Sequence, residues 1–179
     1  MGAIRTSDGF LVDPFKPLVS DVKPRVHMHS ISTINRFTGH ACHPYSVGQH
    51  TLNLIRVVPK HLRRAALVHD WSESWFNDLA SPVKADIPQY KASEHQASRF
   101  IAFWMHVPFA ELDELDQYDK AIYIDERNAL FPIRHDTGMG DDRTGLDMDA
   151  RHFAETYWRD IREALFEQFR NLFPEYGEF

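Results

Sequence analysis

The sequence has little that would let the chain cross-link itself or enter a membrane. Cys42 is the single cysteine among 179 residues, so an internal disulfide is impossible and a thiolate cluster for zinc is excluded. No run of about 18 apolar residues is present, and residues 1–10 lack the basic and then apolar pattern of a secretory signal. We therefore expect a cytoplasmic protein whose metal ligands, if any, are histidine and carboxylate side chains.

The sequence also lacks an excess of positive charge. It has 20 Lys and Arg residues against 26 Asp and Glu residues, which gives a formal net charge of −6. Long nucleic acids are bound mainly by neutralising many phosphates with Lys and Arg, so this balance argues against stable nucleic-acid binding. A single small nucleotide needs only a few local cations or a metal ion, and it remains a plausible ligand.

The length and the hydrophobic pattern predict one all-α domain over residues 1–179. Residues 1–24 contain prolines at positions 14, 17 and 24 together with the alternating segment "GFLVDPF", which indicates a hairpin or an extended arm before the body. Apolar residues then recur at helical spacing, with Ser46 as an N-cap and with Ser81 and Pro82 ending the third helix. The expected helices are about 26–37, 46–58, 60–79, 91–106, 112–130 and, after a polar stretch over 135–147, 149–173.

Four side chains are candidates for holding a divalent metal ion in the core, which we expect to span about 26–130. His69 and Asp70 are adjacent, while His50 and Asp119 lie on two other expected helices. Adjacent residues of a helix point about 100° apart, so His69 and Asp70 can share an ion only over the edge between them. This leaves room for ligands from other helices, and four protein ligands leave positions open for water and substrate.

These residues also carry a resemblance to a known family. The segment "SVGQH", the dipeptide "HD" 19 residues after its histidine, and "YDKAIYID" resemble the H…HD…D signature of the HD-domain metal-dependent phosphohydrolases. The segments "INRFTGH", "HDWSES" and "DLASPVK" are similar to the small helical branch with bacterial 5'-deoxynucleotidases and phage dATP triphosphohydrolases. The resemblance extends over about 31–130, but Ser74 stands where guanosine-polyphosphate hydrolases of the superfamily carry an acid.

The resemblance implies an HD-domain helical bundle that hydrolyses a deoxynucleotide at phosphorus with a divalent ion. His50, His69, Asp70 and Asp119 would be the ligands, and Mn, Co, Zn, Fe or Mg would all suit mixed imidazole and carboxylate ligation. The resemblance also implies a homo-oligomer, in the host cytoplasm if the gene belongs to a phage.

Two further acids are candidates for catalysis. Glu73 would lie one turn after His69 on the same helical face, where its carboxylate could exchange a proton with the attacking water. Its alternative role is to orient a histidine ligand through a hydrogen bond. The resemblance places Asp78 against the sugar 3'-hydroxyl, and its alternative role is to cap the end of the helical region.

The candidate substrate-binding residues are Arg36, Phe37, His40, Pro82 and Lys84. In "NRF" and "SPVK", Arg36 and Lys84 match positions that face the nucleotide in the family, and a guanidinium fork suits phosphate oxygens. Phe37 adjoins Arg36 and could stack on a sugar or a base. The alternatives are a solvated surface for the two cations and a place in the core for Phe37. His40 is expected as a pocket wall or a phosphate donor.

The number of candidate cations favours a nucleoside triphosphate over a monophosphate as the substrate. Arg36, His40 and Lys84, together with Lys120, would supply more positive charge than one phosphate needs. We therefore expect a dATP triphosphohydrolase that releases deoxyadenosine and tripolyphosphate, with a 5'-deoxynucleotidase as the alternative. A non-catalytic nucleotide sensor is a third hypothesis, against which the two candidate catalytic acids argue.

Overall fold

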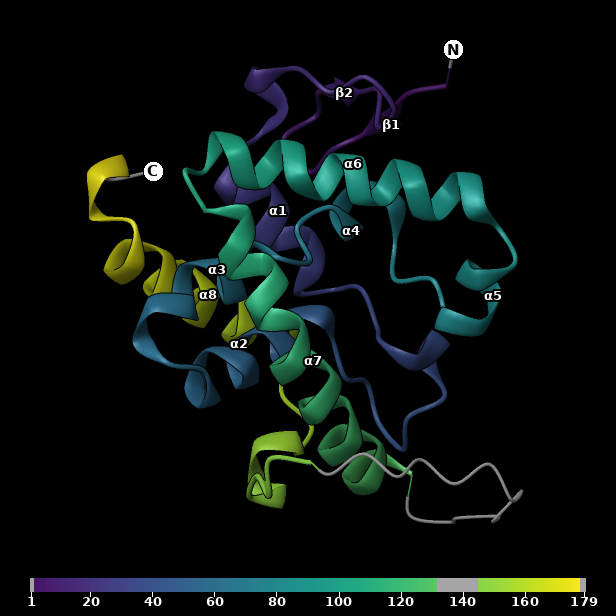
Figure 1. Cartoon of the computed structure of the whole chain (residues 1–179), viewed down its shortest axis with the longest axis vertical. Helices are drawn as coiled ribbons and strands as arrows, with labels where there is room; N and C mark the ends of the chain where they lie inside the picture. The colour runs from purple at the N-terminus through teal and green to yellow at the C-terminus, as the bar shows by residue number, and fades with distance from the viewer. Residues whose placement is uncertain (1, 132–144, 178–179) are drawn as a thin grey trace.

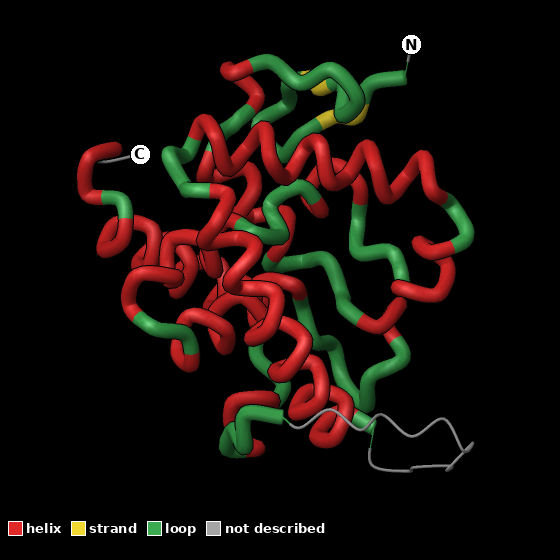
Figure 2. The backbone as a smooth tube through the Cα atoms, in the orientation of Figure 1, coloured by secondary structure: helices red, strands yellow, loops and turns green. Residues whose placement is uncertain are grey.

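The computed structural model describes residues 2–131 and 145–177, and in these ranges the chain is mostly helical (Figures 1 and 2). This confirms the predicted helical class, although most of the polar stretch 135–147 lies outside the described residues. The helices are α1 (Pro24–Ile31), α2 (Val47–Val57), α3 (Arg63–Val68), α4 (Glu73–Phe76), α5 (Ser81–Ala85), α6 (Pro88–Trp104), α7 (Phe109–Leu130) and α8 (Trp158–Leu172).

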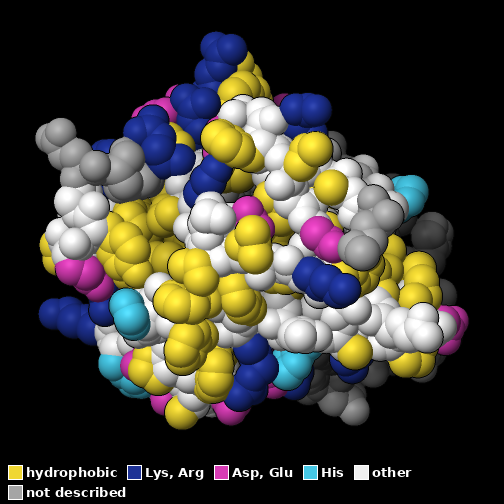
Figure 3. Space-filling view, turned by 90° about the horizontal axis from the view of Figure 1, so that it is seen from above, with side chains coloured by type: hydrophobic (Ala, Val, Ile, Leu, Met, Phe, Trp, Pro, Cys, Tyr) yellow, Lys and Arg dark blue, Asp and Glu magenta, His cyan; other side chains and the backbone are white. Residues whose placement is uncertain are grey.

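The predicted N-terminal hairpin is confirmed. Strands β1 (Ile4–Arg5) and β2 (Leu11–Val12) pair antiparallel, and Gly9 takes a φ of +86° in the turn between them. This arm lies over α6 in Figure 1. Phe15 of the arm packs edge-on against Phe76 of α4. Hydrophobic side chains gather on this face of the molecule (Figure 3). Those of the arm that are exposed are Phe10, Leu11, Phe15, Leu18 and Val19.

Helix α2 packs closely against α8 in the core. A methyl group at Gly48 would lie 3.0 Å from side-chain atoms of both Ile161 and Leu165, and 3.1 Å from the Cα of Ser32. Such distances are shorter than ordinary van der Waals contacts, so only glycine lets the α2 backbone approach this far. The close packing fixes the position of His50, which lies two residues further along and is fully buried.

The prediction of one helix over 60–79 is wrong. Helix α3 ends at Val68, and α4 starts at Glu73 after a tight turn with i to i+3 hydrogen bonds. Two side chains from other parts of the chain form hydrogen bonds with carbonyl groups of this turn. The His27 ring contacts the Trp71 carbonyl, and the Ser98 hydroxyl donates to the His69 carbonyl. Ser81 and Pro82 likewise start α5 and do not end a longer helix.

The first predicted helix is too long, since α1 ends at Ile31 and not near residue 37. After it the chain runs alongside the segment before α2: Val47 donates to the Ile34 carbonyl, and Arg36 donates to the Tyr45 carbonyl. Phe37 and Thr38 then adopt left-handed φ values of 57° and 54°. Arg36 is therefore presented by a loop and not by a helix.

The last predicted helix starts too early. A 3₁₀ turn, Ala150–Phe153, precedes α8, which begins only at Trp158. The side-chain amides of Gln49 and Asn53 donate to backbone carbonyls of this region, and these hydrogen bonds replace helical ones. Trp71 and Trp75 are buried in the core, whereas Trp104 is 38% exposed.

A search for membrane-spanning helices among the described residues finds none that is sufficiently long and apolar.

Candidate metal centre

Three predicted ligands converge from three parts of the chain. His50 lies on α2, His69 follows the last residue of α3, and Asp119 lies on α7, and their ligand atoms are all within 4.8 Å of one another. The His50 Nε2 atom is 3.3 Å from the His69 Nε2 atom and 3.1 Å from Asp119 Oδ1. The described residues therefore contain a His, His, Asp group that could hold a metal ion.

Hydrogen bonds on the far side of each ring orient the two imidazoles. The Nδ1 atom of His50 is 2.6 Å from Glu126 Oε1, and the Nδ1 atom of His69 is 2.8 Å from the Ala66 carbonyl. Both partners accept hydrogen bonds, so Nδ1 is the protonated nitrogen in each ring. If both rings are neutral, the lone pairs of the two Nε2 atoms face each other at 3.3 Å, which is unfavourable; a proton on His50 Nε2, donated to Asp119 Oδ1 at 3.1 Å, or a cation removes this repulsion.

Asp70 lies beside this group, on the side of Arg36. Its Oδ2 atom is 3.0 Å from His69 Nε2 and 3.7 Å from His50 Nε2, and 3.8 Å from an Arg36 guanidinium nitrogen. Asp70 is not part of the tight group of three, but its carboxylate can reach an ion held between the two imidazoles. It is therefore the candidate for a fourth ligand.

The electrostatics of the centre favour a cation. Burial by itself lowers the pKa of His50, as does Arg36, but the carboxylates of Glu126 and Asp119 outweigh both and raise this pKa to about 9. Burial raises the pKa of Asp119, yet the two histidines bring it below its ordinary value. The negative side chains therefore stabilise positive charge at the point where the ligand atoms meet.

Glu126 is a residue of the candidate site that the sequence reasoning missed. It is fully buried on α7, two turns after Asp119, and it accepts hydrogen bonds from His50 and, at 2.9 Å, from the Tyr45 hydroxyl. Its other oxygen is 3.1 Å from the guanidinium of Arg36. The spacing of seven residues from Asp119 places both acids on one helical face, but α7 carries many acids and most of the others are exposed.

Glu73 and Asp78 lie next to the metal centre. Glu73 is 6% exposed, and its Oε2 atom has no hydrogen-bond partner among the described residues. Burial, with the negative charges of Asp70 and Asp78, raises the pKa of Glu73 well above its ordinary value. Asn77 ends α4 with a φ of 68°, and this turn precedes Asp78, whose pKa burial also raises. Both acids can therefore hold a proton under conditions where exposed carboxylates cannot.

The predicted substrate cations are already paired with carboxylates. Arg36 is mostly buried and contacts Glu126, and Lys84 lies 2.7 Å from Glu94, an acid that the sequence reasoning also missed. Burial lowers the pKa of Lys84, but Glu94 outweighs this effect and raises it. These pairs reduce the positive charge that is available to phosphates.

The remaining predicted substrate residues lie further out. Phe37 is half-buried and packs against the rings of Tyr123 and Phe131, so it combines the core role with a place next to Arg36. His40 and Pro82 are exposed, and within the described ranges no hydrogen bond or ion pair joins them to the metal ligands.

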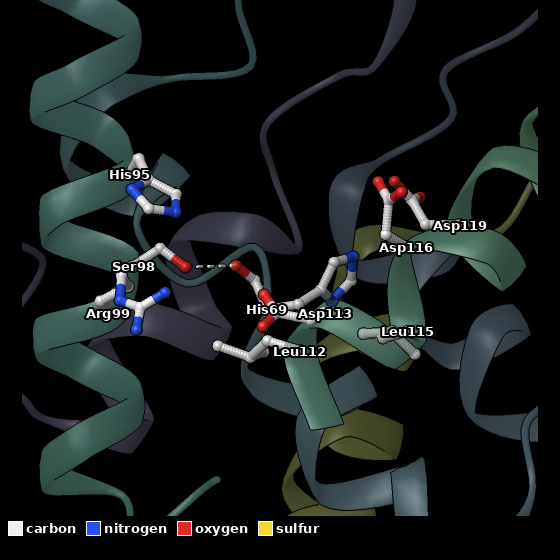
Figure 4. Close-up of a pocket in the computed structure, with 9 residues that line it drawn as sticks. All are labelled: His69, His95, Ser98, Arg99, Leu112, Asp113, Leu115, Asp116 and Asp119. Carbon is white, nitrogen blue, oxygen red and sulfur yellow. Dashed lines mark hydrogen bonds between the residues drawn. The ribbon is translucent and has the colours of Figure 1, made fainter. Parts of the chain in front are cut away.

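A cleft of about 460 Å³ opens between α6 and α7 and reaches two of the ligands (Figure 4). The hydroxyl of Ser98 donates to the His69 carbonyl at 3.3 Å, and this contact ties α6 to the turn that carries the ligands. The residues that line the cleft are His69, His95, Ser98, Arg99, Leu112, Asp113, Leu115, Asp116 and Asp119.

Comparison with known proteins gives a partial match. No protein-family model matches the chain. A stretch of 72 residues, 40% of this chain, is 39% identical to the uncharacterized protein YfdR of Escherichia coli (strain K12). The aligned stretch is also 40% of YfdR, so the chain spans less than half the length of the curated relative that it matches. The name of that protein states no activity.

Glu126→Gln is expected to weaken metal binding by about 10-fold to 100-fold, because this carboxylate orients the His50 ring and increases its basicity. The Kd for Mn²⁺ or Zn²⁺, measured by isothermal titration calorimetry, checks this. Glu114→Gln on the same helix is the control, since Glu114 is exposed and pairs with His61 at 3.1 Å. An unchanged Kd in Glu126→Gln would show that Glu126 does not act on the ligand.

Proposed function

We propose that this chain is a metal-dependent phosphohydrolase of the HD type that hydrolyses a deoxynucleotide, with dATP as the first substrate to test. The observation that carries the proposal is the pair of Nε2 atoms, from His50 and His69, that face each other beside Asp119. The two imidazoles and the carboxylate form a ligand set that suits first-row divalent ions. The resemblance of the surrounding segments to the deoxynucleotide branch supports the substrate class.

In the proposed reaction, some residues would bind the metal ion and another would transfer a proton. His50, His69 and Asp119, with Asp70, would hold a divalent ion such as Mn, Co, Zn, Fe or Mg. Such an ion supplies polarisation of a phosphoryl oxygen and makes water more acidic. Glu73, a buried acid with a raised pKa, would exchange a proton with the attacking water.

The reaction that fits these roles is the attack of water on the α-phosphorus. A bond forms between the water oxygen and phosphorus, and the bond from phosphorus to the nucleoside 5'-oxygen breaks. The 5'-oxygen leaves with a proton as the free deoxynucleoside. From dATP the other product is tripolyphosphate, and from dAMP it is orthophosphate. Asp78 would contact the sugar, and Arg36 would offset negative charge beside the reacting phosphate.

A second candidate function is that of a 5'-deoxynucleotidase. The triphosphate preference rests on surplus cations, but Arg36 pairs with Glu126, Lys84 with Glu94, and Lys120 with Asp116. A substrate with a single phosphate needs fewer free cations, so these ion pairs favour the monophosphate. The same metal centre would serve both substrates.

Product identification decides between the candidates. The protein is incubated with dATP and, separately, with dAMP in buffer that contains Mn²⁺ or Co²⁺, and the products are separated by chromatography. Deoxyadenosine with tripolyphosphate from dATP is the expected result. Deoxyadenosine with orthophosphate from dAMP alone would establish the second candidate. If the protein binds a nucleotide but forms neither product, it is a sensor and the proposed hydrolysis is wrong.

A further inference from the structure

The cleft between α6 and α7 leads from the surface to the metal centre. Two of the candidate ligands, His69 and Asp119, line it, so a ligand in this cleft would touch the centre directly. Figure 4 shows Ser98 and Arg99 on α6 on one side of His69, with Asp119 on the other. A volume of about 460 Å³ lies in the range typical of small-molecule sites.

Arg99 is the notable side chain of the α6 wall. Its guanidinium carbon lies 3.9 Å from the centroid of the Phe109 ring, a cation–π contact that holds the side chain, and Arg99 is half-buried in the cleft wall. Within residues 2–131 and 145–177, Arg99 makes no ion pair with a carboxylate, unlike Arg36 and Lys84. Arg99 is thus positioned by the Phe109 ring, and no carboxylate of the described residues neutralises its charge.

We propose that this cleft is a polyphosphate subsite in which Arg99 binds the phosphates beyond the one that reacts. The inference rests on the proposed function, because it places the reacting phosphate at the metal centre and the phosphate tail along the cleft. An arginine fork makes charge-assisted hydrogen bonds to phosphate oxygens, and such bonds are about twice as strong as neutral ones. A single phosphate at the centre would not extend along the cleft, so Arg99 would select triphosphate over monophosphate.

The α7 wall of the cleft, opposite Arg99, carries acidic side chains that should oppose polyphosphate binding. Asp113 and Asp116 lie on α7 across the cleft, and Asp116 is already paired with Lys120. Asp113 is exposed and would repel a polyphosphate, although water weakens this repulsion. Removal of its charge should therefore tighten polyphosphate binding, whereas removal of the Arg99 charge should weaken it.

The test measures binding of inorganic tripolyphosphate to the purified protein by isothermal titration calorimetry, with no turnover involved. Arg99→Gln should weaken binding by about 10-fold, and Asp113→Asn should tighten it by about 2-fold to 3-fold. Arg99→Lys keeps the charge but not the fork, and it should fall between wild type and Arg99→Gln. The matched control is Arg159→Gln on α8, an exposed arginine that also makes cation–π contacts with aromatic rings but lies outside the cleft.

The outcomes separate this inference from the proposed function. Weaker tripolyphosphate binding in Arg99→Gln, with a Kd in Arg159→Gln equal to wild type, supports the subsite even if the wild type hydrolyses no nucleotide. Equal binding by wild type and Arg99→Gln, or equal loss in both arginine variants, overturns the subsite and leaves any observed hydrolysis in place. In an active protein, a KM for dATP that rises about 10-fold in Arg99→Gln is the expected kinetic counterpart.

Discussion

Asp70→Ala is expected to lose both bound metal and hydrolysis. Asp70 contacts both imidazoles of the centre, and without it the ion would keep the neutral histidines and Asp119. Loss of a residue that only supports a ligand typically costs 10-fold to 100-fold in metal affinity, so loss of a ligand should cost more than about 100-fold. Elemental analysis of the purified variant, together with the nucleotide assay, checks this.

The control for this variant is Asp160→Ala, which removes an exposed acid in the first turn of α8. It should keep the metal content and the turnover of wild type. Stoichiometric metal and full turnover in Asp70→Ala would leave His50, His69 and Asp119 as the complete ligand set. Asp70 would then serve only to balance the charge of Arg36.

Glu73→Gln should retain the metal and bind nucleotide but lose turnover by about 100-fold or more, because glutamine cannot transfer a proton. The carboxyl group of Glu73 is buried next to Asp70 and Asp78, and its raised pKa suits a group that gains and loses a proton during a reaction. Single-turnover kinetics, with nucleotide binding measured separately, distinguish binding from chemistry.

Glu167→Gln, an exposed position on α8, is the matched control and should behave as wild type. If Glu73→Gln loses its metal and regains full turnover when metal is added in excess, Glu73 belongs to the ligand shell and not to the proton transfer. If turnover in Glu73→Gln equals that of wild type with and without added metal, another group transfers the proton.

The helical class was predictable from local sequence signals, whereas the convergence of the ligands was expected from metal-ligand chemistry and from the family resemblance. Ser46 was predicted as the N-cap of α2, and its hydroxyl indeed accepts a hydrogen bond from the Gln49 backbone. This cap and the apolar stripe fix the helix, and the helix in turn fixes the direction of His50. His69 and Asp119 were expected beside it because their order and spacing resemble the H…HD…D signature.

The break in the segment around His69 was not predictable from spacing. The residues from Leu67 to Trp75 keep a helical apolar pattern, but the ring of His69 takes the Ala66 carbonyl and Ser98 donates to the carbonyl of His69. The Ala66 carbonyl is a local partner, three residues before His69, but Ser98 comes from α6, 29 residues further along the chain. Local periodicity contains no information about which distant side chain will occupy a carbonyl.

Glu126 was missed for a similar reason. A carboxylate on an acidic helix is usually solvated, and only the folded structure shows that Tyr45, His50 and Arg36 surround this one. The same folding pairs Arg36 and Lys84 with acids. The sequence identified these cations, but it could not show how much of their charge was already neutralised.

The left-handed backbone at Phe37 and Thr38 has a consequence for affinity. For residues other than glycine this conformation costs roughly 1–2 kcal/mol each, and it persists here because Arg36 is anchored to Tyr45 by the backbone and to Glu126 by its side chain. The ordering cost is incurred when the chain folds and not when a ligand arrives. If the proposed nucleotide stacks its base or sugar on Phe37, it would meet a preorganised surface and lose little affinity to the ordering of this loop.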